Sequence, residues 1–300
     1  MATKEMGIGD ILHYQYSSLP ITLTPADCYG TTYIVTGSNS GLGLECVKHL
    51  VKLGCSRVIM AVRSLERGQA ALSAVEAQTG IKGVAEVWHL DLANFDSVKK
   101  FSAKVEQDLE RVDGLLENAV AAEGSWVVAQ GMESSITVNV VGTMLLAVLL
   151  MPYLSGCAAK FSCQPCIGIV TSSMAFGRQN DLRKIDKGQD VLVDVNNSSK
   201  WSMDGANRYS LSKLLQVLAV RRLARLAPVG KTGVVINLIN PGLSSTGLVR
   251  YSSFSTKLII STLRLLIGRS AEWGSRTLLH GMAAGEESHG KYLSYCEIKE

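Results

Sequence analysis

Short β-rich runs alternate with longer segments of helical periodicity along most of the chain, and this alternation restricts the fold more than any other feature. Strands are expected over residues 32–36, 57–62, 84–90, 114–117, 166–171, 233–239 and 291–294. Helices are expected where apolar residues recur every three or four positions, over residues 43–53, 64–79, 97–110, 134–150 and 209–226. Strands that alternate with crossover helices form parallel sheets covered on both faces. The sequence therefore predicts an α/β fold, a single doubly wound domain with a seven-stranded parallel sheet.

The composition is that of a chain with one substantial core. Of the 300 residues, 47% are hydrophobic and 19% are charged, which excludes intrinsic disorder and a small disulfide-stapled fold. No linker rich in Pro, Gly or Ser divides the chain. We expect an N-terminal extension over residues 1–30 and one domain over residues 31–300. Two segments interrupt the alternation, the polar residues 174–207 and the apolar residues 247–269.

Charge and cysteine content restrict the partners and the compartment. The net charge of +4 comes from scattered residues without a basic block, so nucleic acid is not expected as a partner. The seven cysteines are odd in number and lie mostly in apolar stretches, which favours a reducing, intracellular compartment. Cys163 and Cys166 have the spacing of half a zinc site, but no second pair lies at ligand spacing. We interpret this pair as structural and expect no metal.

No secretory signal and no membrane-spanning helix is predicted. The first sixteen residues lack an apolar core and a cleavage pattern. Two apolar runs, residues 144–151 and 258–267, are each about half of the ~20 residues that a spanning helix needs. We expect buried or interface helices there and a cytoplasmic protein, and we leave peripheral membrane contact by the second run open.

A glycine-rich loop, residues 36–43 (TGSNSGLG), directly follows the first expected strand and opens the first helix. Such a loop lets the backbone approach a pyrophosphate and directs the free N–H groups of a helix N-terminus toward it. Its position predicts a dinucleotide-binding domain of the Rossmann type. The loop residues expected to contact the cofactor are Gly37, Asn39, Ser40, Gly41, Leu42 and Gly43.

The end of the second expected strand bears on the choice of cofactor. Folds that use NAD usually place an acid there, whereas this chain has Val62 followed by Arg63. An arginine can bind a 2′-phosphate bidentately, so the sequence favours NADP(H) over NAD(H). The alternative is a solvated arginine at a strand end. Asp91 and Leu92 suit an edge contact with adenine, and Asn118 suits either the ribose or the neighbouring backbone.

Tyr209 and Lys213 lie four residues apart at the start of a strongly periodic helix, so they share one face. A tyrosine with a pKa near 10 is a poor acid or base at pH 7, but a neighbouring cation stabilises the phenolate and lowers that pKa. By itself the pair fits a solvated helix face equally well.

In this combination and order, the motifs resemble those of the short-chain dehydrogenase/reductase family over about residues 32–296. The glycine-rich loop matches the family's Thr-Gly-x-x-x-Gly-x-Gly segment, and Tyr209 and Lys213 match its Tyr-x-x-x-Lys pair. The family's catalytic serine falls on Ser173, with Ser172 as the adjacent alternative, and its asparagine falls on Asn139. These four positions complete the family's catalytic tetrad.

Further matches narrow the resemblance. Pro241, Gly242, Leu243 and Thr246 look like the family's Pro-Gly-x-x-x-Thr segment at the nicotinamide end of the cofactor. The spacing of the motifs, together with Arg63 and the C-terminal residues 288–292, resembles the retinol-dehydrogenase-like branch and its fungal secondary-metabolism members. One departure is Val120, where the family usually has glycine; its side chain would crowd the cofactor or shift the turn.

The resemblance implies hydride transfer between a nicotinamide and a carbonyl or alcohol carbon. Tyr209 would be the general acid or base, Ser173 would bind the substrate oxygen, and Asn139 would hold a water that relays protons from Lys213. The apolar residues 247–269 would form a substrate lid suited to a bulky, weakly polar alcohol or ketone, unless they simply pack on the core. The family also implies a homodimer. Two alternatives remain open, a catalytically silent NADP-binding scaffold and a nucleotide-fold methyltransferase.

Overall fold

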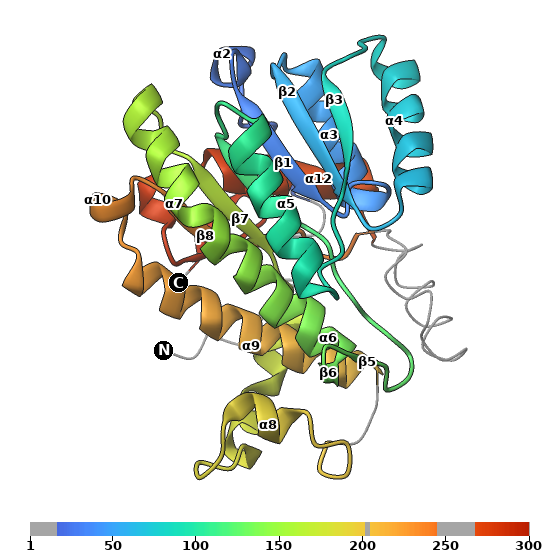
Figure 1. The fold of residues 1–300 in the computed structure, drawn as a ribbon, viewed down its shortest axis with the longest axis vertical. Coiled ribbons are helices and arrows are strands. Elements are labelled where there is room, and N and C mark those ends of the chain that lie inside the picture. Colours follow the sequence, from blue (N-terminus) through green and yellow to red (C-terminus); the bar gives the residue numbers. More distant parts are fainter. Residues whose placement is uncertain (1–16, 202–204, 245–267, 300) are drawn as a thin grey trace.

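One eight-stranded sheet organises the computed structural model, which describes residues 17–201, 205–244 and 268–299 (Figure 1). The strand order is β3-β2-β1-β4-β7-β8-β9-β10, and all neighbouring pairs are parallel except β9 and β10. The strands are β1 (Thr32–Thr36), β2 (Arg57–Val62), β3 (Ala85–His89), β4 (Gly114–Glu117), β7 (Cys166–Val170), β8 (Val235–Asn240), β9 (Tyr292–Ser294) and β10 (Glu297–Lys299). The predicted doubly wound α/β fold and its seven parallel strands are confirmed.

The eighth strand was not predicted from the sequence. It follows β9 after only two residues, Tyr295 and Cys296, whose φ angles are 56° and 57°. A two-residue hairpin turn of this kind usually carries Asn or Gly, because few other residues adopt positive φ. Neither residue signals a turn, so the short antiparallel strand at the sheet edge had no recognisable sequence pattern.

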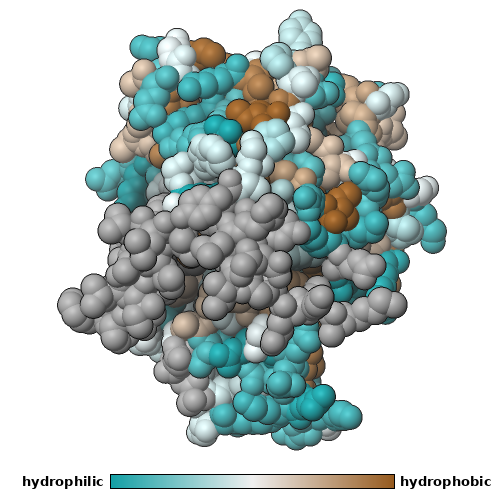
Figure 2. Space-filling model, turned by 180° about the vertical axis from the view of Figure 1, so that it is seen from behind, coloured by the Kyte–Doolittle hydropathy of each residue, from teal (hydrophilic) through white to brown (hydrophobic). Residues whose placement is uncertain are grey.

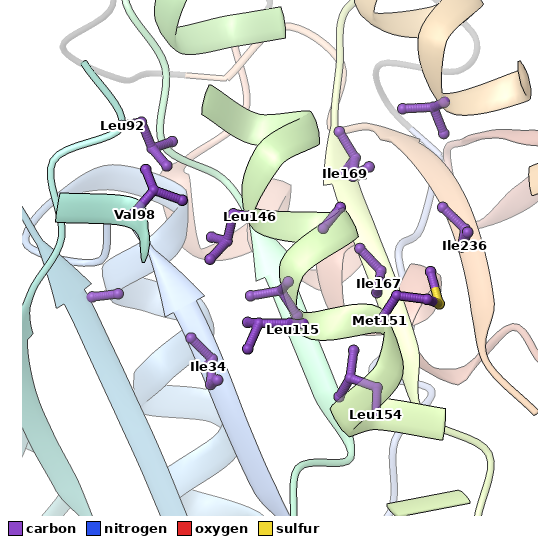
Figure 3. Close-up of a cluster of buried hydrophobic side chains, with 14 of the residues drawn as sticks. Ile34, Leu92, Val98, Leu115, Leu146, Met151, Leu154, Ile167, Ile169 and Ile236 are labelled. Atoms are coloured by element: carbon purple, nitrogen blue, oxygen red, sulfur yellow. The ribbon is translucent and has the colours of Figure 1, made fainter. Parts of the chain in front are cut away.

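Helices cover both faces of the sheet. The helices α3 (Gly41–Lys52), α4 (Leu65–Thr79) and α12 (Ala271–Ala283) lie on one face, and α5 (Phe95–Asp108), α7 (Thr143–Phe161) and α9 (Gly205–Leu226) lie on the other (Figure 1). Because both faces are buried, central strands such as β1, β4 and β8 have no exposed residue and read as nearly continuous apolar runs. Figure 3 shows Leu115, Ile167 and Ile169 of the strands packed against Leu146 and Leu154 of α7.

Shorter elements occupy the connections. They are α2 (Pro25–Cys28), β5 (Val128–Ala129), β6 (Met132–Glu133), α6 (Ser134–Ile136), the π-helical turn η1 (Thr137–Gly142), the 3₁₀ segment η2 (Ser173–Lys184), α8 (Val191–Val195), α10 (Val229–Thr232) and η4 (Glu286–Ser288). The segments η2 and α8 belong to the polar insertion and form a projection beneath α9 (Figure 1). Viewed from behind, the described surface of this projection is mostly hydrophilic (Figure 2).

The continuous helix of α6, η1 and α7, residues 134–161, is long and apolar enough to cross a membrane by composition. In the folded domain, 61% of its most apolar window is buried, and Leu146, Leu150 and Leu154 contact the sheet residues of the core. It is therefore a core helix, as expected for the apolar run 144–151. The second apolar run, 258–267, lies outside the described residues.

The described part of the expected N-terminal extension, residues 17–30, packs against the domain. Leu19, Leu23 and Cys28 are buried, and the guanidinium of Arg276 donates to the carbonyl oxygen of Leu19 at 3.1 Å.

Candidate active site

The loops that follow β1, β4, β7 and β8 lie at one edge of the sheet, because parallel strands end on the same side. The strand order reverses between β1 and β4, where the chain returns to the middle of the sheet after building β2 and β3. In open α/β sheets, ligands bind at the carboxyl edge beside such a reversal. The sequence motifs singled out above follow these same strands, and the structure brings them to this edge.

The glycine-rich loop connects β1 to α3 with little space for side chains. Gly37 has a φ of +64°, and a Cβ there would lie 2.8 Å from the Cα of Ala119. A Cβ on Gly43 would lie 2.5 Å from Nδ2 of Asn118. Ser40 precedes α3 without a side-chain capping hydrogen bond, so the first N–H groups of the helix face the loop without a side-chain partner at that position. This arrangement suits an anion such as a pyrophosphate.

Asn118 holds the glycine-rich loop from the neighbouring strand. Its Nδ2 donates to the carbonyl oxygen of Thr36 at 2.9 Å, and its backbone N–H donates to Oγ1 of Thr36 at 2.9 Å. Of the two roles considered for Asn118, contact with the neighbouring backbone is the one that the structure contains. Val120, two residues later, is 39% exposed.

Arg63 follows β2 beside the glycine-rich loop, where the carbonyl oxygen of Ala61 accepts a hydrogen bond from Gly37. Arg63 is exposed and, among the residues that the structure describes, forms no ion pair or hydrogen bond. A second guanidinium lies close by, since Arg67 of α4 lines an open pocket together with Asn39 and Ser40. Arg67 was not predicted as a cofactor residue, although its position in the first turn of the helix after Arg63 was a usable signal.

Asp91 and Leu92 follow β3 at the same edge. Oδ1 of Asp91 accepts a hydrogen bond from the backbone of Ala93 at 3.0 Å, so part of its carboxylate shapes the local turn. Leu92 is buried, and its carbonyl oxygen lies so close to Gly142 that a Cβ there would approach it to 2.3 Å. Leu92 thereby contacts the π-helical turn that carries Asn139.

Tyr209 and Lys213 share the buried face of α9, as the spacing predicts. Nζ of Lys213 lies 5.9 Å from the centroid of the Tyr209 ring and donates to the carbonyl oxygen of Val170 at 2.7 Å and to Oε1 of Gln216 at 3.1 Å. Burial lowers the pKa of Lys213 to about 7, and the charge of Glu117 opposes this change. Burial raises the pKa of Tyr209 to about 12, and a hydrogen bond from Ser172 opposes it.

The structure distinguishes the two adjacent serines. Ser172 is half-buried, interacts with the Tyr209 phenol and accepts a hydrogen bond from the N–H of Met174 at 3.3 Å. Ser173 is exposed and begins the segment η2. Ser172 has an extended backbone, with φ −146° and ψ 143°, and its side chain caps the 3₁₀ segment that begins at Ser173. The serine that lowers the pKa of the Tyr209 phenol is the alternative, Ser172.

Asn139 lies in the π-helical turn η1 and is completely buried. Its side chain binds both backbone groups of Ala121 at 2.8 Å, and its Nδ2 also donates to Oγ of Ser212 at 2.9 Å. Its backbone carbonyl accepts a hydrogen bond from Nε2 of Gln216 at 2.7 Å. Gln216, which the sequence analysis missed, therefore links Lys213 to Asn139. Its spacing of three residues from Lys213 was the available signal.

A third residue that was not predicted as functional is Glu117, the last residue of β4. It is 2% exposed, and burial raises its pKa well above the ordinary value, an effect that the charge of Lys213 opposes. An acid at the end of an apolar strand is uncommon unless it has a partner. The presence of an acid at the end of this apolar strand was therefore the sequence signal available for Glu117.

Pro241, Gly242 and Leu243 follow β8 at the same edge, and Gly242 has a φ of 69°. Thr246 and most of the expected lid lie outside the described residues. Among the described residues, no group of three or more His, Cys, Asp or Glu side chains is arranged to hold a metal ion.

Comparison with known proteins agrees with this geometry. Residues 31–175 match the family model described as short chain dehydrogenase. A short chain dehydrogenase/reductase of Cryptosporiopsis sp. is 42% identical over 293 residues, covering 97% of this chain and 88% of the relative. A short-chain dehydrogenase of Penicillium roqueforti is 37% identical over 295 residues, covering 96% and 76%. A solved short chain dehydrogenase of Shigella flexneri, complexed with NADP, has a TM-score of 0.64 at 19% identity and covers 90% of this chain and 99% of its own.

Proposed function

The chain belongs to the short-chain dehydrogenase/reductase family of oxidoreductases, and from this premise we propose that it transfers a hydride between NADP(H) and a carbonyl or secondary alcohol carbon of a bulky apolar metabolite. The observation that carries the proposal is the buried pair Tyr209 and Lys213 beside Ser172, at the sheet edge that also holds the glycine-rich loop. We assign the reaction to fungal secondary metabolism, with support from relatives in Cryptosporiopsis and Penicillium.

The residues at this edge fit a nicotinamide dinucleotide. Gly37 and Gly43 let the loop pack closely against Ala119 and Asn118, where a Cβ would clash, and the start of α3 offers N–H groups for a pyrophosphate. The hydroxyl of Ser38 is buried without a hydrogen-bond partner in the described part of the chain. We assign the binding of the cofactor to the loop residues named above, with Asp91 and Leu92 near the adenine and residues 241–243 near the nicotinamide.

The nicotinamide, when bound, supplies the hydride donor or acceptor. In reduction, the phenol of Tyr209 donates its proton to the developing alkoxide of the substrate, and in oxidation its phenolate accepts the alcohol proton. Burial opposes the phenolate, so a nearby positive charge and a hydrogen-bond donor must stabilise it. Lys213 supplies the charge and Ser172 supplies the donor.

When substrate is bound, the single hydroxyl proton of Ser172 is donated to the substrate oxygen in place of the phenol, because Ser172 reaches the Tyr209 phenol from the end of β7. Asn139 has a structural task. Its side chain fixes the loop after β4 through Ala121, and its contact with Ser212 fixes α9. The side chain of Asn139 thereby holds both α9 and the loop after β4.

Two exposed guanidinium groups support the choice of NADP(H). Arg67 lines a pocket with Asn39 and Ser40, which follow β1, and Arg63 follows β2, whose residue Ala61 is hydrogen-bonded to Gly37 of the same loop. A 2′-phosphate attracts such groups, whereas the ribose hydroxyls of NAD(H) do not require them. NAD(H) is therefore the weaker candidate.

An apolar substrate is supported by two exposed apolar side chains at the carboxyl edge. Val120 follows β4 and Met174 follows β7, and they are 39% and 48% exposed. The apolar composition of residues 247–269 points in the same direction. We propose that these residues select bulk and low polarity in the substrate.

The test is NADPH oxidation, followed by the loss of its absorbance, with a panel of cyclic hydrophobic ketones and of small polar ketones. Turnover of the hydrophobic group that disappears in Tyr209→Phe supports the proposal. NADPH binding without turnover of any ketone or alcohol would favour the silent scaffold instead. We also propose a cytoplasmic location, which the seven cysteines support, and a homodimer.

A further inference from the structure

Glu117 is a buried acid for which the proposed mechanism has no use. It is 2% exposed, and in the described part of the chain neither of its carboxylate oxygens accepts a hydrogen bond. An ionised carboxylate without partners is strongly destabilising inside a protein. The group must therefore be protonated or face a positive charge.

The sheet directs Glu117 toward α9. Leu115, two residues earlier on β4, packs in the core cluster with Leu146 of α7 and Val217 of α9, as Figure 3 shows for Leu115 and Leu146. Side chains alternate along a strand, so Glu117 lies on this same face. It is in register with Ile169 of β7. The next residue of β7, Val170, accepts the hydrogen bond from Lys213.

The carboxyl group of Glu117 and the ammonium group of Lys213 thus approach the same end of the β4–β7 ladder, one from the sheet and one from the helix. Each is the charged group that acts on the pKa of the other. Lys213 is itself 2% exposed and held by Val170 and Gln216. Its position therefore does not depend on an ion-pair contact with Glu117.

The other titratable groups of the surrounding elements are directed elsewhere or do not titrate between about pH 7 and 8.5. Tyr33 of β1 and Cys166 of β7 pack on the opposite face of the sheet, and η1 carries no titratable side chain. Arg208 of α9 pairs with Glu133 at 2.9 Å. Tyr209 lies beside Lys213, but burial raises its pKa to about 12, so the phenol stays protonated in this pH range. The titratable residues of α7 lie in its second half, away from η1, and are Tyr153, Cys157 and Lys160.

We propose that Glu117 and Lys213 form a buried acid–base pair of zero net charge, in which Glu117 is a positioning residue that keeps a proton available to Lys213. Each group alone would be neutral in this site, because burial disfavours both charges. Together they hold one proton whether it is on the amine or on the carboxyl group. The consequence for turnover rests on the proposed function, whereas the pairing is a property of the folded chain alone.

The test is urea unfolding of the protein without added cofactor between about pH 7 and 8.5, for wild type, Glu117→Gln, Lys213→Met and the double variant. Glu117→Gln leaves Lys213 neutral in the folded state and protonated in the unfolded chain. Its stability relative to wild type should therefore rise with pH, by about tenfold in the unfolding equilibrium constant per pH unit. Lys213→Met leaves Glu117 protonated when folded and ionised when unfolded, so its relative stability should fall by about the same factor.

The double variant should show no pH dependence relative to wild type, because the pair binds the same number of protons in both states. Glu86→Gln is the matched control; Glu86 lies on β3 at the far edge of the same sheet, is partly exposed and pairs with Arg57 at 2.7 Å. The Glu86→Gln variant should have the same pH dependence of stability as wild type. If the stability of Glu117→Gln changes with pH as that of wild type does, the proposed pair is wrong. If that variant does not fold, Lys213→Met decides the question. The proposed pair is also wrong if the stability of Lys213→Met relative to wild type does not fall as the pH rises.

Activity provides a separate readout. In Glu117→Gln, we expect the rate of alcohol oxidation to fall mainly through kcat. The pH at which this rate rises should also be higher than in wild type, because the neutral lysine no longer stabilises the Tyr209 phenolate. If the relative stabilities of Glu117→Gln and Lys213→Met change in opposite directions with pH but the protein turns over no alcohol or ketone, the pair is supported and the proposed function is rejected. If the enzyme is active but both variants have the pH dependence of wild type, the function is supported and the pair is rejected.

Discussion

The ammonium nitrogen of Lys213 lies 5.9 Å from the centroid of the Tyr209 ring, and its 2.7 Å hydrogen bond goes to the carbonyl of Val170. The strand β7 therefore fixes the lysine beside the tyrosine, one helical turn away. No hydrogen bond joins Lys213 to the phenol in the described part of the chain, so the effect that we propose for the lysine on Tyr209 is electrostatic. The two residues can then be altered separately, which makes their roles open to experiment.

Tyr209→Phe removes only the ionisable hydroxyl. We expect kcat to fall by about 10²–10⁴-fold, the range for loss of a general acid or base, while NADPH affinity stays within a small factor of wild type. Stopped-flow measurement of NADPH oxidation and fluorescence titration of the cofactor test the two parts. A variant that keeps wild-type turnover would rule out Tyr209 as the proton donor.

The two serines should differ sharply on substitution. Ser172→Ala removes the hydrogen bond to the Tyr209 phenol, so we expect kcat to fall by about 10²–10³-fold. The pKa of Tyr209 should also rise, because that hydrogen bond lowers it, and the rising limb of the oxidation rate should move to higher pH. Ser173→Ala is the matched control. If it abolishes turnover while Ser172→Ala does not, the assignment returns to Ser173.

Arg63→Ala and Arg67→Ala should each weaken NADP(H) binding by about 10–100-fold, the range for loss of a hydrogen bond to a charged group. Binding of NAD(H) should change little, because it has no 2′-phosphate. Titration of both cofactors by tryptophan fluorescence measures the ratio. Equal weakening of NAD(H) and NADP(H) would show that these arginines do not read the 2′-phosphate.

Assembly is tested through two apolar residues on the helical layer of α7 and α9. Val148 of α7 and Leu218 of α9 are 49% and 44% exposed. We expect a dimer by light scattering at micromolar concentration, and a monomer after Val148→Glu and Leu218→Glu are combined, because the new charges would be buried at the interface. Val193→Glu, on the polar projection, should leave the mass unchanged. A monomeric wild type contradicts the proposal.

The sequence was sufficient for the sheet and for the chemistry-bearing motifs because each depended on local pattern. The apolar runs of β1, β2 and β4 matched their expected bounds, and the spacing of Tyr209 and Lys213 placed them on one helix face. The loop residues Gly37 and Gly43 were recognisable from their position between a strand and a helix.

Residues that act through contacts between distant segments were not predictable in this way. Glu117 and Lys213 meet only because β4 and α9 pack on the same sheet face, although 96 positions separate them in the chain. Gln216 gains its role from the carbonyl that the π-helical turn at Asn139 leaves free. The difference between Ser172 and Ser173 depends on the direction of one residue at a strand end, which periodicity does not fix.

Gly43→Ala tests whether the glycine-rich loop is the cofactor site. The added Cβ would lie 2.5 Å from Nδ2 of Asn118 and 3.0 Å from the carbonyl oxygen of Gly37, so Asn118 must move and release the carbonyl of Thr36. We expect NADPH affinity to fall at least about tenfold and stability to fall by about 1–3 kcal/mol, the range for overpacking. Gly156→Ala is the matched control, since Gly156 lies in α7 and a Cβ added there would meet no neighbouring side chain within 4 Å. It should stabilise the helix by up to about 1 kcal/mol and leave NADPH binding unchanged. Urea unfolding and cofactor titration of both variants measure these effects, and unchanged NADPH affinity in a folded Gly43→Ala protein would move the cofactor away from this loop.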